Sequence, residues 1–386
     1  MRRVAAAIAA AAGLAVAGCG EQEPSARHPA QRAVGIQIGR PLEASLNGVG
    51  DVDGDGRPDV VVGDGRGRRA WLLVSRGGAR LVPLDGYAGA GGAPSDANAS
   101  PLGDLDRDGL WDFAIPTVRR TLAVLYGRGR WPRRVDLLAA HPRDAATITG
   151  TSATGAPTNA ARSGGGLVLG SDCGEGDCSG SSPVAALAIP RRGTLTSVAD
   201  GTPRAKPQVR IKGGGSVGNV ANFWANGSPP WTTWSTSKGP LVQAGERSWF
   251  LGFYDTLLGT APGAALAATS SNAPPGEDDK SALKLYHLRP DGRTSARVLA
   301  PQQALTALGT LATLDDCSVV SGWNASPPEV WLLDPVSLKT IARWSFGGSV
   351  RVLAQPMRGG RALDVLVIGA TGRVARATLP VPAGKC

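Results

Sequence analysis

Beyond residue 20, apolar residues occur in short runs separated by glycine, proline, asparagine and aspartate. Clear examples are Ala70–Val74 and Leu122–Tyr126. Short apolar runs bounded by turn-forming residues are typical of β-strands, and helical spacing is hard to find in the same region. The pattern predicts an all-β protein.

The strand pattern repeats along the chain. One segment contains Val60–Gly63, Ala70–Val74 and Arg80–Leu84, and the next contains Phe113–Ile115, Leu122–Tyr126 and Arg134–Leu138. Weaker copies continue near 166–189, 265–288, 318–344 and 364–379. A period of about 50 residues with four strands per unit is typical of a β-propeller, in which ring closure removes exposed sheet edges. We expect a single propeller of seven blades with four antiparallel strands each; six or eight blades are the alternatives.

Two stretches within this repeat follow the frame D-x-D-x-D-G-x-x-D, and each leads into an apolar run. Alternating aspartates direct several carboxylates toward one centre, and the glycine allows the turn that brings in later ligands. Calcium accepts such a set of hard oxygen ligands. The predicted ligands of two calcium sites are Asp51, Asp53, Asp55, the Arg57 carbonyl and Asp59, and Asp104, Asp106, Asp108, the Leu110 carbonyl and Asp112.

Three other interpretations of these loops are a helix-loop-helix calcium site, metal-free turns and a magnesium site. A helix-loop-helix calcium site needs glutamate at position 12, where this chain has Val62 and Ile115. Metal-free turns are the simplest alternative, and magnesium is less suited because it retains waters in a tight octahedron. No histidine or cysteine marks an open catalytic position, so we expect the two ions to be structural.

Residues 47–64 and 101–116 resemble FG-GAP repeats, as seen in Gly50-Asp51-Val-Asp-Gly-Asp-Gly and Gly103-Asp104-Leu-Asp-Arg-Asp-Gly. That family includes the integrin α-chain N-terminal domain and many bacterial secreted proteins. The resemblance implies a seven-bladed propeller with calcium in loops between blade strands. It is specific only in these two segments, so further calcium sites are not expected.

The N-terminus has the form of a secretory signal, with Arg2-Arg3 before an alanine-rich apolar run that is too short to span a membrane. Val16-Ala17-Gly18-Cys19 resembles the bacterial lipobox, which implies cleavage before Cys19 and a lipid on its thiol. The alternative is an ordinary signal with an incidental cysteine. We therefore expect a signal peptide at 1–18, a flexible tether at 19–33 and the propeller at 34–386, anchored outside the cytoplasm on the cell membrane or outer membrane.

Four further cysteines fit an oxidising compartment. The local loop predicts one disulfide between Cys173 and Cys178, which leaves Cys317 to pair with Cys386. Three pairings are possible in principle, and zinc spacing is not evident.

The formal charge of +10 falls to +8 without Arg2 and Arg3. Arginines are mostly scattered, and no nucleic-acid-binding module is visible, so no nucleic-acid partner is expected. The denser group at Arg128, Arg130, Arg133 and Arg134 is a weaker candidate for an anionic partner.

The predicted function is a lipid-anchored binding or scaffold protein of the cell envelope, whose loops meet an unidentified envelope protein or polysaccharide. Two alternatives remain. A carbohydrate-binding propeller would use exposed tryptophan rings, although the same rings can fill the core; the candidates are Trp224, Trp231, Trp234 and Trp249. A lyase or hydrolase acting on polysaccharide is less expected. Of the three histidines, His28 lies in the tether, His141 and His287 have no evident partner, and no H-E-x-x-H helix occurs.

Overall fold

The computed structural model describes most of residues 25–382. The description leaves out residues 1–24, 40, 43, 64–68, 89–98, 140–144, 150–155, 164–165, 173–184, 198–221, 224–230, 237–238, 245–246, 253–254, 262, 270–282, 301–309, 315–316, 322–326, 335, 338 and 383–386.

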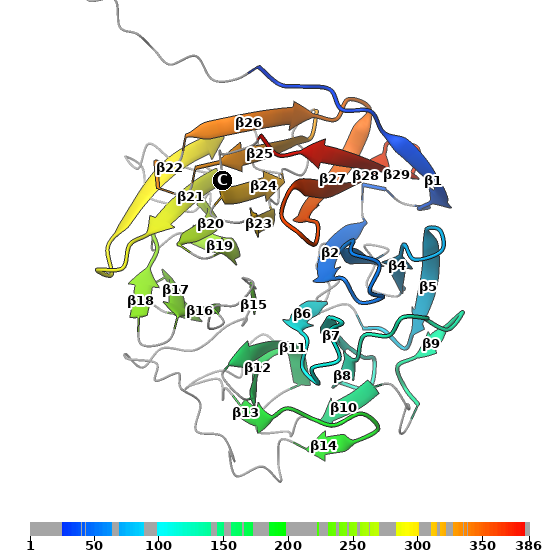
Figure 1. The fold of residues 1–386 in the computed structure, drawn as a ribbon. Helices are drawn as coiled ribbons and strands as arrows, with labels where there is room; N and C mark the ends of the chain where they lie inside the picture. Colours follow the sequence, from blue (N-terminus) through cyan, green and yellow to red (C-terminus); the bar gives the residue numbers. More distant parts are fainter. Residues whose placement is uncertain are drawn as a thin grey trace, which may run out of the picture.

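The described strands form sheets that follow one another around a central axis, so the all-β single β-propeller is confirmed (Figure 1). The first sheet contains β2 (Ser45–Gly50), β3 (Asp59–Gly63), β4 (Ala70–Val74), β5 (Arg80–Asp85) and β9 (Val135–Asp136). The second contains β6 (Ser100–Gly103), β7 (Asp112–Pro116), β8 (Thr121–Leu125), β10 (Ala145–Thr149) and β14 (Leu195–Ser197). The third contains β11 (Ala156–Ser163), β12 (Gly166–Asp172) and β13 (Ala185–Ala188).

Four more sheets complete the ring. They contain β15 (Asn222–Phe223), β16 (Trp231–Thr236), β17 (Gly239–Ala244) and β18 (Arg247–Phe250); then β19 (Asp255–Ala261), β20 (Ala264–Thr269), β21 (Leu283–Leu288) and β22 (Thr294–Ala300). They continue with β23 (Thr310–Leu314), β24 (Cys317–Ser321), β25 (Glu329–Leu333) and β26 (Thr340–Ser345), and end with β27 (Ser349–Pro356), β28 (Ala362–Gly369), β29 (Arg373–Pro380) and β1 (Arg32–Gln37).

The predicted regular architecture is wrong. Among the described residues, five sheets are complete blades with four antiparallel strands of at least four residues each. The third sheet has three strands, and the sheet that follows it begins with β15, which has only two residues. Neither seven blades of four strands nor the six- or eight-bladed alternatives describe this arrangement. The expectation extended the period of two strong repeats into a glycine- and proline-rich stretch that does not carry the strand pattern.

The element-by-element match of the first two repeats also fails at its last strand. The predicted strand Arg134–Leu138 forms only β9, which pairs in parallel with β5 of the first sheet. The antiparallel outer strand of the second sheet is β10. Arg80 explains the difference, because its guanidinium donates to the carbonyls of Trp131 (2.9 Å) and Pro132 (2.9 Å) and holds this segment against the first sheet.

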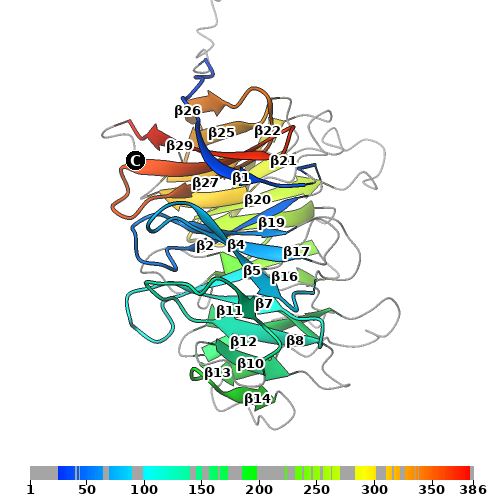
Figure 2. The ribbon, with the colours of Figure 1, turned by 90° about the vertical axis from the view of Figure 1, so that its right-hand side faces the viewer.

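The core lies between neighbouring sheets. Fully buried residues such as Leu72, Phe113 and Leu125 come from the first and second sheets and form one cluster. A similar cluster joins the last sheet to the first. Seen from the side, the strands of successive sheets lie one above another (Figure 2). Burial of strand residues between sheets explains why many central strands read as continuous apolar runs.

The N-terminal segment joins the last sheet. β1 pairs antiparallel with β29, and Arg27 forms a bridge with Trp344 of β26. Arg27, Arg32 and Ala33 therefore take part in β-pairing, and all three lie within residues 19–33, the segment predicted as a tether. The described residues contain no helix long and apolar enough to cross a membrane.

The predicted signal peptide and Cys19 lie outside the described residues, as do Cys173, Cys178 and Cys386. Cys317 lies in β24 and is 1% exposed. The disulfide pairing stays a prediction.

Candidate metal centre

Each aspartate loop connects the innermost strand of a sheet to the next strand: β2 to β3 in the first sheet and β6 to β7 in the second. Strand register shifts where each loop begins, at Gly48/Gly50 and at Pro101/Gly103. The glycine that precedes each loop has a positive φ, +82° at Gly50 and +67° at Gly103. This left-handed conformation turns the chain out of the strand and suits glycine best.

Inside the loops, Gly56 and Gly109 have φ values of +86° and +87°. The predicted sharp turn at the sixth position of the frame is therefore present in both loops. The turn wraps each loop so that successive backbone N–H groups point at its first aspartate.

The first loop brings three of its four predicted carboxylate ligands together. Asp51, Asp53 and Asp59 each have a carboxylate oxygen within 4.8 Å of the others. Asp53 is 1% exposed and Asp59 is fully buried. Three carboxylates this close repel one another strongly unless a cation or protons neutralise them.

Backbone groups orient these carboxylates. Asp51 accepts hydrogen bonds from the N–H groups of Gly54 (2.7 Å), Asp55 (3.0 Å) and Gly56 (3.0 Å). Asp53 accepts one from the N–H of Arg76 (2.9 Å). These bonds fix the carboxylates before any ion binds.

Asp55, the fourth predicted carboxylate ligand, is directed differently. Its Oδ2 accepts a hydrogen bond from the Ser75 hydroxyl (2.7 Å), and its Oδ1 accepts one from the Arg57 N–H (2.9 Å). It lies outside the cluster of three. Direct ligation by Asp55, and by the carbonyls of Arg57 and Leu110, stays a prediction.

Asp59 is the residue that best fits a bound cation. Its Oδ2 accepts a hydrogen bond from the Val52 N–H (3.0 Å), whereas its buried Oδ1 has no hydrogen-bond partner among the described residues. Burial, followed by the charge of Asp53, raises the pKa of Asp59 well above its usual value. Burial also raises the pKa of Asp53. A buried carboxylate oxygen without a donor is costly, and a hard divalent cation would satisfy it.

The second loop gathers a different set. Here Asp104, Asp106 and Asp108 have carboxylate oxygens within 4.8 Å of one another, and Asp106 and Asp108 are exposed. Asp112, which corresponds to Asp59, has partners on both oxygens: the N–H of Leu105 (2.6 Å) and the N–H of Gly127 (2.8 Å).

Burial nevertheless raises the pKa of Asp112 to about 7, against the lowering effect of the two N–H donors from Gly127 and Leu105. Asp112 is fully buried, like its counterpart in the first loop. The difference between the loops therefore lies in hydrogen bonding and not in exposure.

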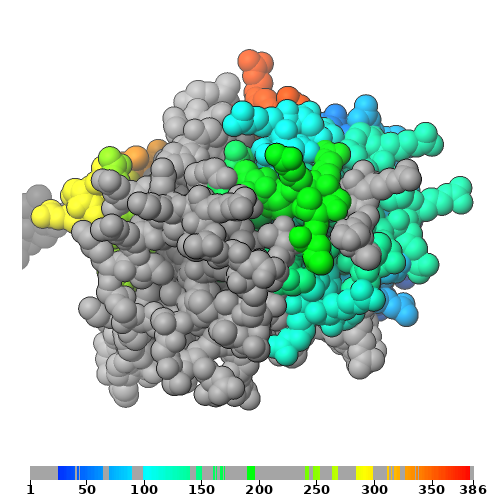
Figure 3. All heavy atoms as spheres, turned by 90° about the horizontal axis from the view of Figure 1, so that it is seen from below, coloured from blue at the N-terminus to red at the C-terminus, as the bar shows by residue number. Residues whose placement is uncertain are grey.

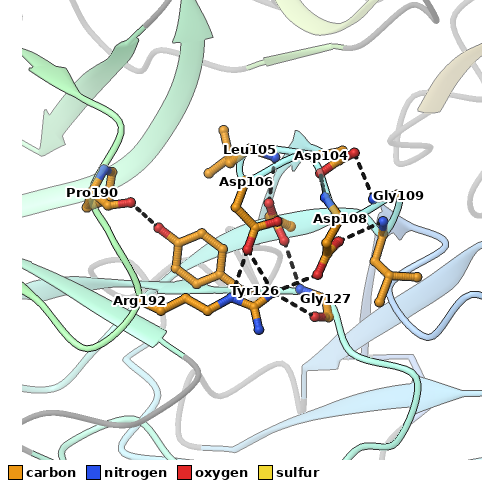
Figure 4. A network of polar contacts seen from close by, with 11 residues as sticks. Asp104, Leu105, Asp106, Asp108, Gly109, Tyr126, Gly127, Pro190 and Arg192 are labelled. Carbon is orange, nitrogen blue, oxygen red and sulfur yellow. Dashed lines mark hydrogen bonds and ion pairs between the residues drawn. The ribbon is translucent and has the colours of Figure 1, made fainter.

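A guanidinium sits on the second loop (Figure 4). Arg192 Nε donates to Asp106 Oδ2 (2.8 Å), and Arg192 Nη2 lies 2.7 Å from the Oδ2 atoms of both Asp106 and Asp108. Its guanidinium carbon also lies 5.2 Å from the centre of the Tyr126 ring, whose hydroxyl donates to the Pro190 carbonyl. The segment between β13 and β14, which carries Arg192, lies against the second sheet (Figure 3).

Sequence reasoning missed Arg192. It lies 84 residues after Asp108 in the chain, in a Pro-Arg-Arg-Gly turn without any spacing relation to the aspartate frame. Only the pairing of β14 with β10 brings it to the loop.

The last sheet supports the first loop from outside the cluster. Asp364 of β28 is 3% exposed and lies 3.6 Å from Arg376 Nε and 3.7 Å from Arg57 Nη1. The Arg358 N–H donates to the Gly56 carbonyl (3.1 Å). The first loop, which belongs to the first sheet, is therefore also held in place by residues of the last sheet.

The structure describes only part of the predicted tryptophan surface. Trp249 is 2% exposed, and its indole N–H donates to the Arg289 carbonyl (2.7 Å), so this ring lies in the core and not on a sugar-binding face. Trp231 and Trp234 lie in β16, and Trp224 lies outside the described residues. Glycan binding by Trp224, Trp231 and Trp234 stays a prediction.

Comparison with known proteins identifies one family match, and it covers only part of the chain. The FG-GAP-like repeat family matches residues 51–115, which contain both aspartate loops. No curated protein matches the chain. Three similar solved structures have low sequence identity. BBS1N in complex with ARL6DN is 11% identical with a TM-score of 0.47, over 92% of this chain and 99% of that one.

The WD40 domain of Toxoplasma gondii coronin is 12% identical with a TM-score of 0.49, over 94% of this chain and 87% of that one. Kuenenia stuttgartiensis hydrazine synthase is 11% identical with a TM-score of 0.46, over 89% and 96%. The sequence identity to all three structures is low, and the propeller is defined by the chain's own sheets. Residues 51–115 are similar to the FG-GAP-like repeat family and lie within a β-propeller whose acidic clusters could hold a metal ion.

Proposed function

We propose that this protein is a lipid-anchored propeller of the cell envelope, stabilised by calcium, whose loops bind a protein or glycan partner. The observation that carries the calcium part is the buried Asp59 Oδ1, which lacks a hydrogen-bond partner among the described residues beside Asp51 and Asp53. Calcium would be held by these three carboxylates and would neutralise their repulsion. It would thereby stabilise the loop between β2 and β3.

The metal part is tested by thermal melting of the full chain, purified in a mild detergent, in calcium and in chelator. A ligand that binds only the folded state stabilises it by about 2.7 kcal/mol at a hundredfold excess over its dissociation constant. We expect calcium to raise the melting temperature by several degrees and magnesium to raise it less.

The matched variants are Asp53→Asn in the first loop and Asp291→Asn as the control, because Asp291 is exposed in a turn far from the loops in sequence. Asp53→Asn should abolish most of the calcium shift, whereas Asp291→Asn should leave it unchanged. A melting temperature that does not respond to calcium in the parent protein would contradict the proposal.

The anchoring part rests on the predicted lipobox and Cys19. Expression in bacteria with an alkyne-tagged fatty acid should label the parent protein and place it in the membrane fraction. Cys19→Ser should lose both the label and the membrane association. An unlabelled parent protein would remove the anchor from the proposal.

The binding part rests on the propeller fold and on the predicted envelope location, and fold alone does not name the partner. Purified Cys19→Ser protein should sediment with isolated envelope fragments. Protease treatment of the fragments beforehand separates the two partner classes: it abolishes binding to a protein and spares binding to a glycan. Failure to sediment with untreated fragments would contradict a binding role.

A further inference from the structure

The two aspartate loops share one sequence frame but differ in what neutralises them. In the second loop, the Arg192 guanidinium contacts Asp106 and Asp108 at 2.7 Å each. In the part of the chain that the structure describes, no arginine or lysine side chain forms an ion pair with Asp51, Asp53 or Asp59. The charge of Arg376 lowers the pKa of Asp59 by less than burial raises it, and its guanidinium pairs with Asp364 (3.6 Å). Arg57, the nearest basic residue in the sequence, is directed to Asp364 instead.

Arg192 is held in place by more than the two carboxylates. Its Nη2 lies 3.4 Å from the Gly127 carbonyl, and its guanidinium lies over the Tyr126 ring. Arginine stays charged at any pH at which a protein is folded, and its planar group donates to two carboxylates at once. A divalent ion at Asp106 and Asp108 would have to displace this cation.

The buried carboxylates show the same contrast. Asp112 Oδ1 and Oδ2 both accept backbone hydrogen bonds, whereas Asp59 has one satisfied and one unsatisfied oxygen. The second loop is therefore complete without a metal ion, and the first is not. The sequence frame alone predicts two equal sites.

We infer that Arg192 takes the place of the metal ion in the second loop, so that the protein binds one calcium, at Asp51, Asp53 and Asp59. The second loop is a latent site that opens when Arg192 is removed. This inference rests on the proposed calcium function of the first loop.

The test is isothermal titration calorimetry of the full chain with calcium chloride, which reports the number of sites directly. The parent protein should bind one ion, and Asp53→Asn should bind none. Arg192→Ala should bind two, and adding Asp106→Asn to it should restore one. Circular dichroism confirms that each variant is folded, and Arg192→Gln replaces Arg192→Ala if the latter aggregates.

Two control variants test whether the effect requires the position of Arg192 and whether a positive charge at that position is enough. Arg191→Ala removes the neighbouring exposed arginine and should leave one site. Arg192→Lys keeps a positive charge near the carboxylates and should also leave one site.

The number of bound ions distinguishes a failure of the Arg192 inference from a failure of the calcium proposal. Two sites in the parent protein, one of them lost on Asp106→Asn, would overturn the role of Arg192 while leaving calcium binding intact. One site in a folded Arg192→Ala protein would also overturn it. No binding in either the parent protein or Arg192→Ala would overturn the calcium proposal itself.

Discussion

The two buried aspartates of the loops, Asp59 and Asp112, have the same position in the sequence frame but different hydrogen-bond partners. Asp59 and Asp112 occupy the same position in the frame, and both are fully buried. Asp112 receives an N–H donor on each oxygen, but Asp59 receives only one. Because an unsatisfied buried oxygen costs free energy, Asp59 is destabilising without a further partner such as a cation, whereas Asp112 is already satisfied.

The raised pKa of Asp112 predicts a pH dependence in chelator. Its pKa is about 7 in the folded protein and near 3.8 without burial, so the folded state binds the extra proton between these values. Its contribution to stability is therefore present at low pH and is lost as pH rises through about 7. The loss is on the order of 2–4 kcal/mol for one such group.

Urea unfolding in chelator at pH 5, 6 and 8 measures this effect. Stability of the parent protein should fall across this range more steeply than that of Asp112→Asn, which has no proton to lose. Asp291→Asn, at an exposed site, should keep the slope of the parent protein. Equal slopes for the parent protein and Asp112→Asn would contradict the assignment.

At the scale of elements, the glycine that ends β2 joins strand to loop. Gly50 has a φ of +82°, and a Cβ built there would lie 2.1 Å from the ring of Trp111. Trp111 itself packs against the core between the first two sheets. Gly50 therefore lies where β2, the first loop and the second sheet meet, and the space beside its Cα admits only a hydrogen atom.

Gly50→Ala should destabilise the protein by about 2–5 kcal/mol, the sum of left-handed strain and a steric overlap. Gly56→Ala is the matched control, because Gly56 has a φ of +86° but no atom within 4 Å of the added Cβ. It should cost only the strain, about 1–2 kcal/mol. Chemical denaturation of both variants compares the two costs, and equal losses would show that Trp111 does not limit the site.

At the scale of the whole molecule, the two ends of the chain close the ring. β1 forms the outer edge of the last sheet by pairing with β29. The Arg351 guanidinium of β27 donates to the Ala44 carbonyl (3.1 Å) just before β2. The last sheet thus contains the N-terminal strand and also contacts the first sheet.

Deleting residues 1–37 should lower the free energy of unfolding by about 2–5 kcal/mol, because it removes the strand hydrogen bonds and the packing of Val34 and Ile36. Deleting residues 1–24 is the control, because it keeps Arg27 and β1. Thermal melting and limited proteolysis should separate the two truncated proteins. Equal stability would show that β1 is dispensable for ring closure.

Much of the fold follows from local pattern. Ala70–Val74 was predicted as a strand and is β4 with the same bounds, because a buried apolar run between turns leaves few alternatives. Pairing is harder to predict. Arg134–Leu138 carries a strand pattern of the second repeat but contributes β9 to the first sheet, because Arg80 holds its neighbours through their carbonyls.

The candidate site shows the same limit. The frame predicted which residues form the loops, and the structure brings Asp51, Asp53 and Asp59 together. The frame did not predict that Asp55 faces Ser75, because Ser75 lies beyond β4 and reaches the loop only through sheet pairing. Side-chain direction in such loops depends on partners from other strands.

The sequence by itself determined the all-β propeller, the two aspartate loops and their glycine turns, because strand period and turn chemistry are local properties of the chain. Tertiary structure alone decided the incomplete sheets, the partners of β9 and β14, and the contrast between the loops. Arg192 illustrates the reason: its charge reaches Asp106 and Asp108 through the pairing of β14 with β10, and no local pattern encodes a contact between residues so far apart in the chain.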